Sequence, residues 1–270
     1  MKEDTIVMFS GGKDSLVLMD QNRDLKAVYI YHELEFDQTL EYVESLQGTY
    51  DIEIVKVHKD YFKMCEQLCI PSRRMKWCCK VFKLAPVAAY VKKHKIKRCL
   101  TGVRADESST RSSYEETDDL FFPWIQERPL LNWTEKDIWR YIRNNNLSTN
   151  PLYKYLDRVG CWCCPFNSKK DWGVARDFMP EKYAKFKEMI KKVAETDINP
   201  EYKRHFLKGG WAGWAYKTDV EIVGNLPAGT DHIEMEKRLN CVGCGACKLL
   251  KNVKMGCIAR NYNPHRKVMV

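Results

Sequence analysis

The fold of this 270-residue chain is decided near its start by the stretch TIVMFSGGKDS at residues 5–15. Its first five residues form a short apolar pattern that is typical of a buried strand, and a glycine-containing turn at 10–12 ends that strand. A helix is predicted from residue 14 to residue 20. Glycines at such a turn let the backbone approach a ligand closely, the helix N-terminus favours an anion, and Lys13 adds a positive charge. The stretch therefore predicts a phosphate site between a strand and a helix.

Apolar patterns of two different periods alternate along the residues that follow. Strands are predicted at 26–31, 51–57, 98–103 and 120–125, and helices at 37–47, 61–68 and 80–93. A further helix is predicted after Thr134, which resembles an N-cap with Asp137 at the third helical position. Strands that alternate with helices indicate an α/β fold, here a doubly wound and mostly parallel sheet of five strands.

The regular alternation ends near residue 150, and three parts of the chain are predicted. Residues 1–168 form a nucleotide-binding α/β domain that carries a first cysteine site. Residues 169–235 form a Lys-rich helical region, whose aromatic side chains are expected to be a packing face, and a glycine-rich junction. Residues 236–270 form a ferredoxin-like cysteine module. The C-terminal region is therefore predicted to be helical and rich in cysteine.

The net charge of +9 is confined to two basic blocks, and each block contains cysteines. Residues 71–104 hold 11 Lys or Arg, residues 237–270 hold 8, and neither block contains Asp or Glu. Such blocks suit a nucleic acid partner, and they also offset the negative charge of a thiolate-bound cluster. Composition leaves both uses open.

Location is predicted from what the sequence lacks. No apolar run reaches the ~20 residues that a membrane span requires, and the first residues do not resemble a signal peptide. We therefore expect a cytoplasmic protein without a membrane partner. Thiols stay reduced in that compartment, so the 12 cysteines are expected to be metal or cluster ligands in preference to disulfides.

The hexapeptide SGGKDS at 10–15 differs in spacing from the common P-loop and from the dinucleotide-binding glycine motif. It resembles the PP-loop, Ser-Gly-Gly-x-Asp-Ser, of the ATP pyrophosphatases in the adenine nucleotide alpha hydrolase superfamily. The resemblance implies that Mg²⁺-ATP binds the loop and is cleaved between its α- and β-phosphates; an ordinary strand-to-helix turn is the alternative. The nucleotide-binding residues so implied are Ser10, Gly11, Gly12, Lys13, Asp14 and Ser15, with catalytic roles for Lys13, Asp14 and Ser15.

Three further motifs resemble the phosphoadenylylsulfate (PAPS) reductase family, and the resemblance extends over residues 5–166. They are TGVRADESSTR at 101–111, PLLNWTEKDIW at 129–139, and NPLY at 150–153 leading into Gly160-Cys161. The resemblance implies that Gly102, Arg104 and Arg111 belong to the nucleotide site, where the two guanidinium groups contact phosphates. Ion pairs of these arginines with Glu107 and Glu115 are the alternative.

Two sets of cysteines have the spacing of metal ligands. In the APS reductases of the same family, a Cys-Cys pair and a Cys-x-x-Cys pair hold one [4Fe–4S] cluster. The corresponding residues here are Cys78, Cys79, Cys161 and Cys164. Cys163 adds a thiol as a spare ligand, a sulfur carrier or a buried small hydrophobic residue. The second set consists of Cys241, Cys244, Cys247 and Cys257. Its spacing suits a second cluster, with zinc as the alternative.

The functional prediction depends on where the chain departs from the family. APS and PAPS reductases carry a C-terminal Glu-Cys-Gly-Leu/Ile-His segment whose cysteine attacks the substrate, and these 270 residues contain no such segment. The remaining features resemble the ATP pyrophosphatase component of DNA phosphorothioation systems of the Dnd/Ssp kind. That resemblance implies an enzyme that adenylates an acceptor, a nucleic acid backbone such as DNA, for sulfur insertion.

The same resemblance implies partners. They are a cysteine desulfurase as sulfur donor and either a nucleic acid, such as DNA, or other subunits of a sulfur-modification complex. Two alternatives remain open: an APS/PAPS reductase that releases sulfite, and a scaffold whose cluster only recruits a partner.

Overall fold

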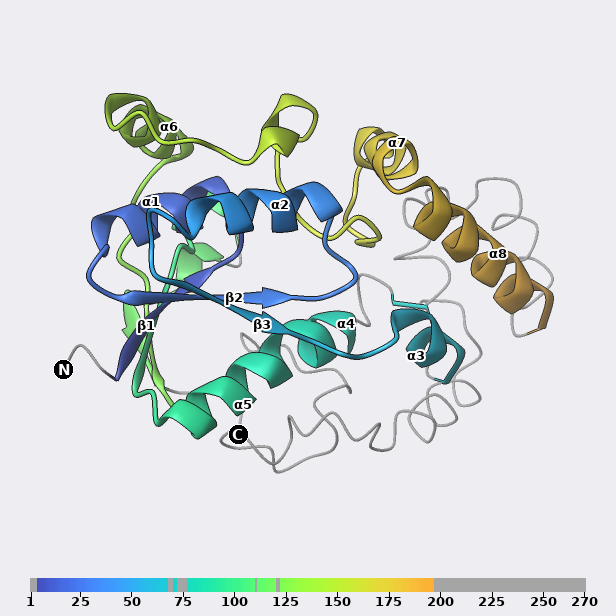
Figure 1. Cartoon of the computed structure of the whole chain (residues 1–270), viewed down its shortest axis with the longest axis horizontal. Coiled ribbons are helices and arrows are strands. Elements are labelled where there is room, and N and C mark those ends of the chain that lie inside the picture. The colour runs from blue at the N-terminus through green and yellow to red at the C-terminus, as the bar shows by residue number, and fades with distance from the viewer. Residues whose placement is uncertain (1–3, 68–69, 72–76, 110, 120–121, 197–270) are drawn as a thin grey trace.

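The computed structural model describes residues 4–67, 70–71, 77–109, 111–119 and 122–196 (Figure 1). The second cysteine set and the predicted module at 236–270 lie outside the described residues. The described part is a mixed α/β structure in which helices cover a central sheet.

The sheet has six strands in the order β3-β2-β1-β4-β6-β5. They are β1 (Thr5–Phe9), β2 (Lys26–Tyr31), β3 (Ile52–Lys56), β4 (Arg98–Thr101), β5 (Thr117–Asp118) and β6 (Ile125–Glu127). All neighbours pair in parallel except the edge strand β5, which is antiparallel to β6. The chain order reverses between β1 and β4, so the loops after these two strands face a common crevice, where open α/β sheets bind their ligands.

Helices cover both faces of this sheet (Figure 1). Those of the first half are α1 (Lys13–Gln21), α2 (Asp37–Leu46), α3 (Tyr61–Gln67), α4 (Trp77–Cys79), the π-helical turn η1 (Lys80–Leu84) and α5 (Ala85–His94). Those of the second half are η2 (Ala105–Glu107), η3 (Arg111–Ser113), α6 (Glu135–Asn144), η4 (Pro151–Lys154), α7 (Lys169–Phe178) and α8 (Pro180–Thr196). Alternate side chains of β1 divide the core between the faces: Val7 packs with α1, α2 and α6, whereas Ile6 packs with α5.

The predicted α/β class and the parallel sheet are confirmed, but the number of strands and one strand position were wrong. The predicted strand at 120–125 is instead β6, which begins at Ile125, and β5 was not predicted. Phe122 and Trp124 caused the error, because these apolar residues pack against each other and against α5 and do not belong to a strand. The two rings stack with centroids 4.5 Å apart, and Trp124 is buried with α5. Two-residue strands such as β5 leave almost no periodic signal.

Besides the core on each face of the sheet, a separate apolar cluster lies at the end of the molecule that contains Cys78 and Cys163. It joins α3, α4 and η1 to α7 and α8, with Trp77, Trp162 and Phe186 almost fully buried. The predicted packing face of the Lys-rich region is thus observed at Phe186. Among the described residues, no helix combines the length and the apolar character needed to cross a membrane.

Candidate active site

The glycine loop lies at the carboxyl end of β1, directly at the point where the strand order reverses. Gly11 has a φ of +72°, a left-handed conformation that side chains rarely adopt, and a Cβ there would lie 2.7 Å from Thr39 Cγ2. Gly102, just after β4, packs against the loop so closely that a Cβ would lie 2.9 Å from the backbone of Asp14 and Ser15. The two strand ends therefore meet backbone to backbone, as a phosphate cradle requires.

Hydrogen bonds fix the shape of the loop. The Ser15 hydroxyl accepts from the Ser10 N–H at 3.1 Å and lies 3.0 Å from the Gly12 carbonyl oxygen, to which it donates. Ser15 thus closes the hexapeptide on itself.

The segment at 150–153 holds the same loop from outside. The backbone N–H of Lys13 donates to the Tyr153 hydroxyl at 2.7 Å, and the buried Asn150 amide donates to the Gly11 carbonyl at 3.2 Å. Burial raises the pKa of Tyr153, so its hydroxyl stays protonated and keeps a hydrogen to donate. Tyr153 was part of a quoted motif, but no spacing rule predicted that it would reach the loop 140 residues away.

Charged side chains around the loop form one network. The Lys13 ammonium lies 3.3 Å from Asp14 and 3.3 Å from Glu135 at the start of α6. Lys13 is itself only 5% exposed, so its charge is directed at the loop rather than at solvent. Glu135 was not predicted as a site residue, because it occupies a variable position of the quoted motif.

The two predicted arginines differ in their surroundings. Arg104 is 3% exposed, and its Nε donates to Asp14 at 2.6 Å while Nη1 donates to Asp106 at 3.1 Å. These contacts orient Asp14, which makes Arg104 a positioning residue in this structure. Arg111 forms an ion pair with Glu107, one of the partners predicted as an alternative. Burial and the nearby charge of Arg158 lower the pKa of Arg111.

The first cysteine set comes together from two distant segments. Cys78 and Cys79 end α4, and their thiols contact each other, which together with burial raises the pKa of Cys78. Cys161 and Cys164 lie in the loop before α7, where burial raises the pKa of both thiols and the nearby Cys79 thiol adds to the effect. The structure therefore places all four predicted ligands in one region.

Hydrogen bonds attach the second cysteine loop to the residues that follow β2. The Trp162 backbone N–H donates to the Leu34 carbonyl at 2.9 Å, and its indole N–H donates to the Glu33 carbonyl at 3.1 Å. Within the loop, the Cys164 N–H donates to the Cys161 carbonyl at 3.2 Å. The loop is thus held at the same edge of the sheet as the glycine loop, because β1 and β2 are parallel neighbours.

Four thiols from two segments are the donor set that an iron–sulfur cluster or a thiolate-bound metal requires. Cys163 differs from them, since it is 3% exposed and packs in the apolar cluster beside Tyr61. Of its three predicted roles, that of a buried small hydrophobic residue matches this position. Cys65 and Cys99 are also buried.

A buried polar cluster that the sequence did not predict lies against Cys161. Ligand atoms of His32, Glu35 and Cys161 lie within 4.8 Å of one another, and His32 Nε2 is 3.1 Å from Glu35 Oε1. This donor set could hold a metal ion, but the Lys83 ammonium lies 3.2 Å from the same carboxylate oxygen and already supplies a positive charge. Burial opposes ionisation of Glu35, but Lys83 and His32 outweigh it and lower the pKa to about 2. The cluster is therefore an ion-paired unit.

The doubly wound sheet, with a glycine loop at its switch point, defines a nucleotide-binding α/β protein. Comparison with known families identifies it further, because the model of the phosphoadenosine phosphosulfate reductase domain matches residues 4–167. The chain belongs to this family.

Relatives of several kinds are similar to the chain. An uncharacterized protein of Methanocaldococcus jannaschii, MJ0973, is 33% identical over 211 residues, which cover 75% of this chain and 50% of that protein. The adenosine 5'-phosphosulfate reductase of Anoxybacillus flavithermus is 29% identical over 174 residues, covering 60% of this chain and 73% of that enzyme. A crystal structure of PAPS reductase from Candida auris matches with 19% identity and a TM-score of 0.49, covering 60% of this chain and 82% of that chain. The chain spans about half the length of MJ0973 and of the related protein MJ0066.

Proposed function

We propose that the protein is an ATP pyrophosphatase that adenylates an acceptor for sulfur insertion, as in DNA phosphorothioation systems of the Dnd/Ssp kind. One observation carries the proposal: the glycine loop after β1 and the cysteine loop attached after β2 lie at the carboxyl ends of adjacent parallel strands. A nucleotide on the first loop would therefore face the same edge of the sheet as the thiols. Activation and sulfur transfer need this proximity of the two groups.

The charged network suggests how the activation step would proceed. Lys13 and the loop N–H groups neutralise the β- and γ-phosphates, while Asp14, oriented by Arg104, helps to hold Mg²⁺. An acceptor oxygen attacks the α-phosphorus, the bond between the α- and β-phosphates breaks, and pyrophosphate leaves. The terminal sulfur of a persulfide on the desulfurase then attacks the activated acceptor and displaces AMP. A thiol reduces the S–S bond that joins the acceptor to the desulfurase, which releases the sulfur-containing product and leaves a disulfide. Positioning and charge neutralisation supply most of the rate, as in other phosphoryl transfers.

A hollow beside the loop offers room for the acceptor. Its volume is about 840 Å³, and Glu135, Trp139, Arg140 and Arg143 contribute to its lining. Arginine and tryptophan side chains suit the phosphates and bases of a nucleic acid. A nucleic acid acceptor and a cysteine desulfurase as sulfur donor are the partners that we propose.

The cysteines complete the proposal. Cys78, Cys79, Cys161 and Cys164 would hold a [4Fe–4S] cluster, which supplies redox or sulfur chemistry when bound. The second set, beginning at Cys241, would hold a second cluster or zinc.

The experiment is release of pyrophosphate from labelled ATP by the full chain, with and without nucleic acid and a cysteine desulfurase. Lys13→Ala should lower the rate at least a hundredfold, because it removes the buried ammonium of the loop. Lys92→Ala, an exposed lysine on α5 at the opposite face, is the matched control and should keep full activity. Lack of pyrophosphate under every condition would refute the proposal.

An APS or PAPS reductase is the second candidate, and the family match together with the relatives named as adenosine 5'-phosphosulfate reductases favours it. Sulfite release from either sulfonated nucleotide, with a thiol or ferredoxin as reductant, would support this candidate. Sulfite release without pyrophosphate formation from ATP would replace the first proposal by the second.

A further inference from the structure

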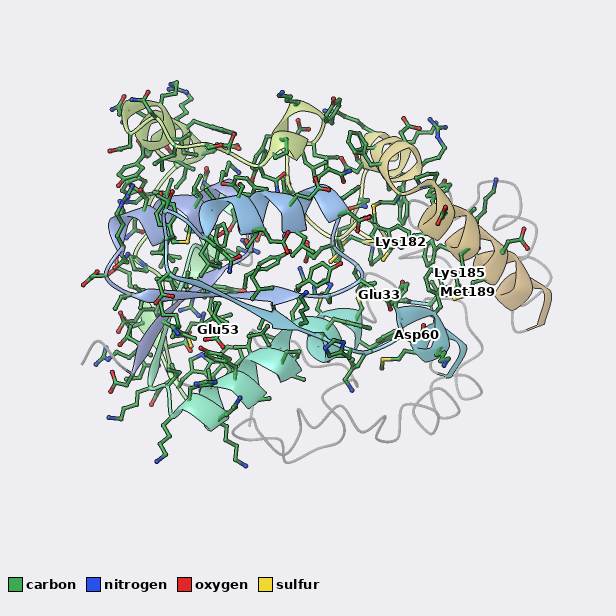
Figure 2. All side chains as sticks on the ribbon, viewed as in Figure 1. Glu33, Glu53, Asp60, Lys182, Lys185 and Met189 are labelled. Carbon is green, nitrogen blue, oxygen red and sulfur yellow. The ribbon has the colours of Figure 1, made fainter. Side chains whose placement is uncertain are left out.

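Glu33 and Glu35, in the loop that joins β2 to α2, have different surroundings. Glu33 accepts a hydrogen bond from the Tyr61 backbone N–H and lies in the field of Lys182 and Lys185 on α8. Figure 2 shows Glu33 on the side of the molecule that contains α3 and α8. Glu35 is 4% exposed and faces Lys83. The two carboxylates therefore have different partners.

One oxygen of the Glu35 carboxylate, Oε1, lies close to both His32 and Lys83. His32 Nε2 lies 3.1 Å from Oε1, and the Lys83 ammonium lies 3.2 Å from it. His32 has no measurable exposure, and its ring meets Phe82 edge-on with centroids 5.8 Å apart. Packing thus fixes the imidazole beside the carboxylate.

Lys83 is the more exposed member of the Lys83–Glu35 pair. Its side chain is 40% exposed, whereas that of Glu35 is 5% exposed, so the carboxylate is the anchor of the pair. Lys83 belongs to the π-helical turn that directly follows Cys79, and such turns often occur at functional sites. The Glu35 carboxylate that it contacts has an oxygen within 4.8 Å of Cys161 Sγ, which places this ion pair beside the cysteine site.

We propose that Glu35 is a positioning residue that holds the Lys83 ammonium beside the cysteine site, where this positive charge raises the reduction potential of the cluster bound there. The inference rests on the cluster assignment of the proposed function. A fixed positive charge stabilises the reduced cluster, which carries one more negative charge than the oxidised form. A lysine free to extend into water would lose most of this effect, because solvent screens its charge.

The experiment measures the cluster midpoint potential in the reconstituted full chain and uses Lys83→Met as a probe. In the unaltered protein, Lys83→Met should make one-electron reduction about tenfold less favourable, a decrease of about 59 mV. In a Glu35→Gln background the same substitution should change the equilibrium constant for one-electron reduction by less than about twofold. In a Glu33→Gln background, the matched control, the full tenfold effect should remain. Thermal unfolding of each variant confirms that it is folded.

The possible failures are distinguishable. An equal effect of Lys83→Met in the Glu35→Gln and Glu33→Gln backgrounds would refute the positioning role of Glu35 while leaving the cluster intact. No effect of Lys83→Met in any background would refute it as well. If the unaltered chain binds no cluster at these cysteines after reconstitution, both this inference and the cluster assignment are wrong, whereas pyrophosphate release tests the ATP-dependent activity separately.

Discussion

The glycine loop and the cysteine site lie at the same edge of the sheet, but they are built by different forces. The loop takes its shape from bonds within one hexapeptide, such as the contact of Ser15 with Ser10, and from close backbone packing at Gly102. The cysteine site is assembled from segments about 80 residues apart and is held by a large apolar cluster around Trp77 and Trp162. Close backbone packing therefore determines the shape of the loop, whereas burial of apolar side chains holds together the segments that carry the cysteines.

Removal of a cysteine ligand should have the largest effect. Cys161→Ser should lower the iron content of the reconstituted full chain by about four atoms, because a cluster that loses one of its four thiolates is no longer held. Iron and acid-labile sulfide analysis measures the loss. Cys99→Ser is the control, since Cys99 is buried on β4 in the α5 core and should leave the iron content unchanged. Equal iron content in both variants would contradict the ligand assignment.

Gly102→Ala adds a methyl group where the end of β4 contacts the glycine loop, and it tests whether the two backbones pack as closely as the structure shows. Gly102→Ala places a Cβ 2.9 Å from backbone atoms of Asp14 and Ser15, which cannot move as a flexible side chain does. We expect a loss of about 3 kcal/mol in the free energy of unfolding, and at least tenfold weaker ATP binding. Urea unfolding and nucleotide titration measure the two effects.

The matched control for this substitution is Gly173→Ala in α7. A Cβ at Gly173 meets no atom within 4 Å, so the substitution should stabilise the helix by up to about 1 kcal/mol. If Gly102→Ala behaved like Gly173→Ala, the close contact between β4 and the loop would be absent in solution.

Substitutions in the charged network around Asp14 should have smaller effects on stability. Arg104→Lys keeps the charge but cannot bond Asp14 and Asp106 at the same time, because it lacks the guanidinium fork. We expect a loss of about 2 kcal/mol by urea unfolding. Arg140→Lys, at an exposed pair with Asp137, should change stability by less than about 0.5 kcal/mol. Equal effects at the two positions would show that burial of Arg104 has no energetic consequence.

The smallest effect is expected at the start of α6. The Thr134 hydroxyl accepts from the Asp137 N–H while Asp137 accepts from Thr134, so both predicted capping residues are confirmed. Thr134→Ala should cost about 1 kcal/mol at pH 7. The same bonds lower the pKa of Asp137, so their contribution is present above pH 3.8 and is lost as pH falls through the lower folded value. The difference between Thr134→Ala and the unaltered chain should therefore shrink below about pH 3.8, which unfolding curves measured at several pH values would show.

The elements that were predicted correctly have signals within a few residues. The alternation of β1 with α1, the bounds of β2, and the cap at Thr134 each depend on local periodicity or local hydrogen bonding. The strand at 120–125 failed because Phe122 and Trp124 are apolar for packing, and local patterns do not distinguish packing from strand pairing.

The candidate site shows the same division. The hexapeptide predicted the glycine loop after β1, and the cysteine spacing predicted that two distant segments meet. No spacing connects Tyr153 with Lys13, Glu135 with the loop, or Lys83 with Glu35, because each of these pairs is separated by tens of residues or more.

The sequence by itself determined the α/β class, the glycine turn after the first strand and the family, since strand period, glycine content and motif order act over short distances. Only the tertiary structure decided that Arg104 orients Asp14, that Glu35 faces Lys83 and that Glu33 faces α8. Side chains of neighbouring residues point in opposite directions once the backbone is placed, and their partners arrive from other strands and helices. Pairings of this kind depend on the packing of the whole chain, which local sequence patterns do not encode.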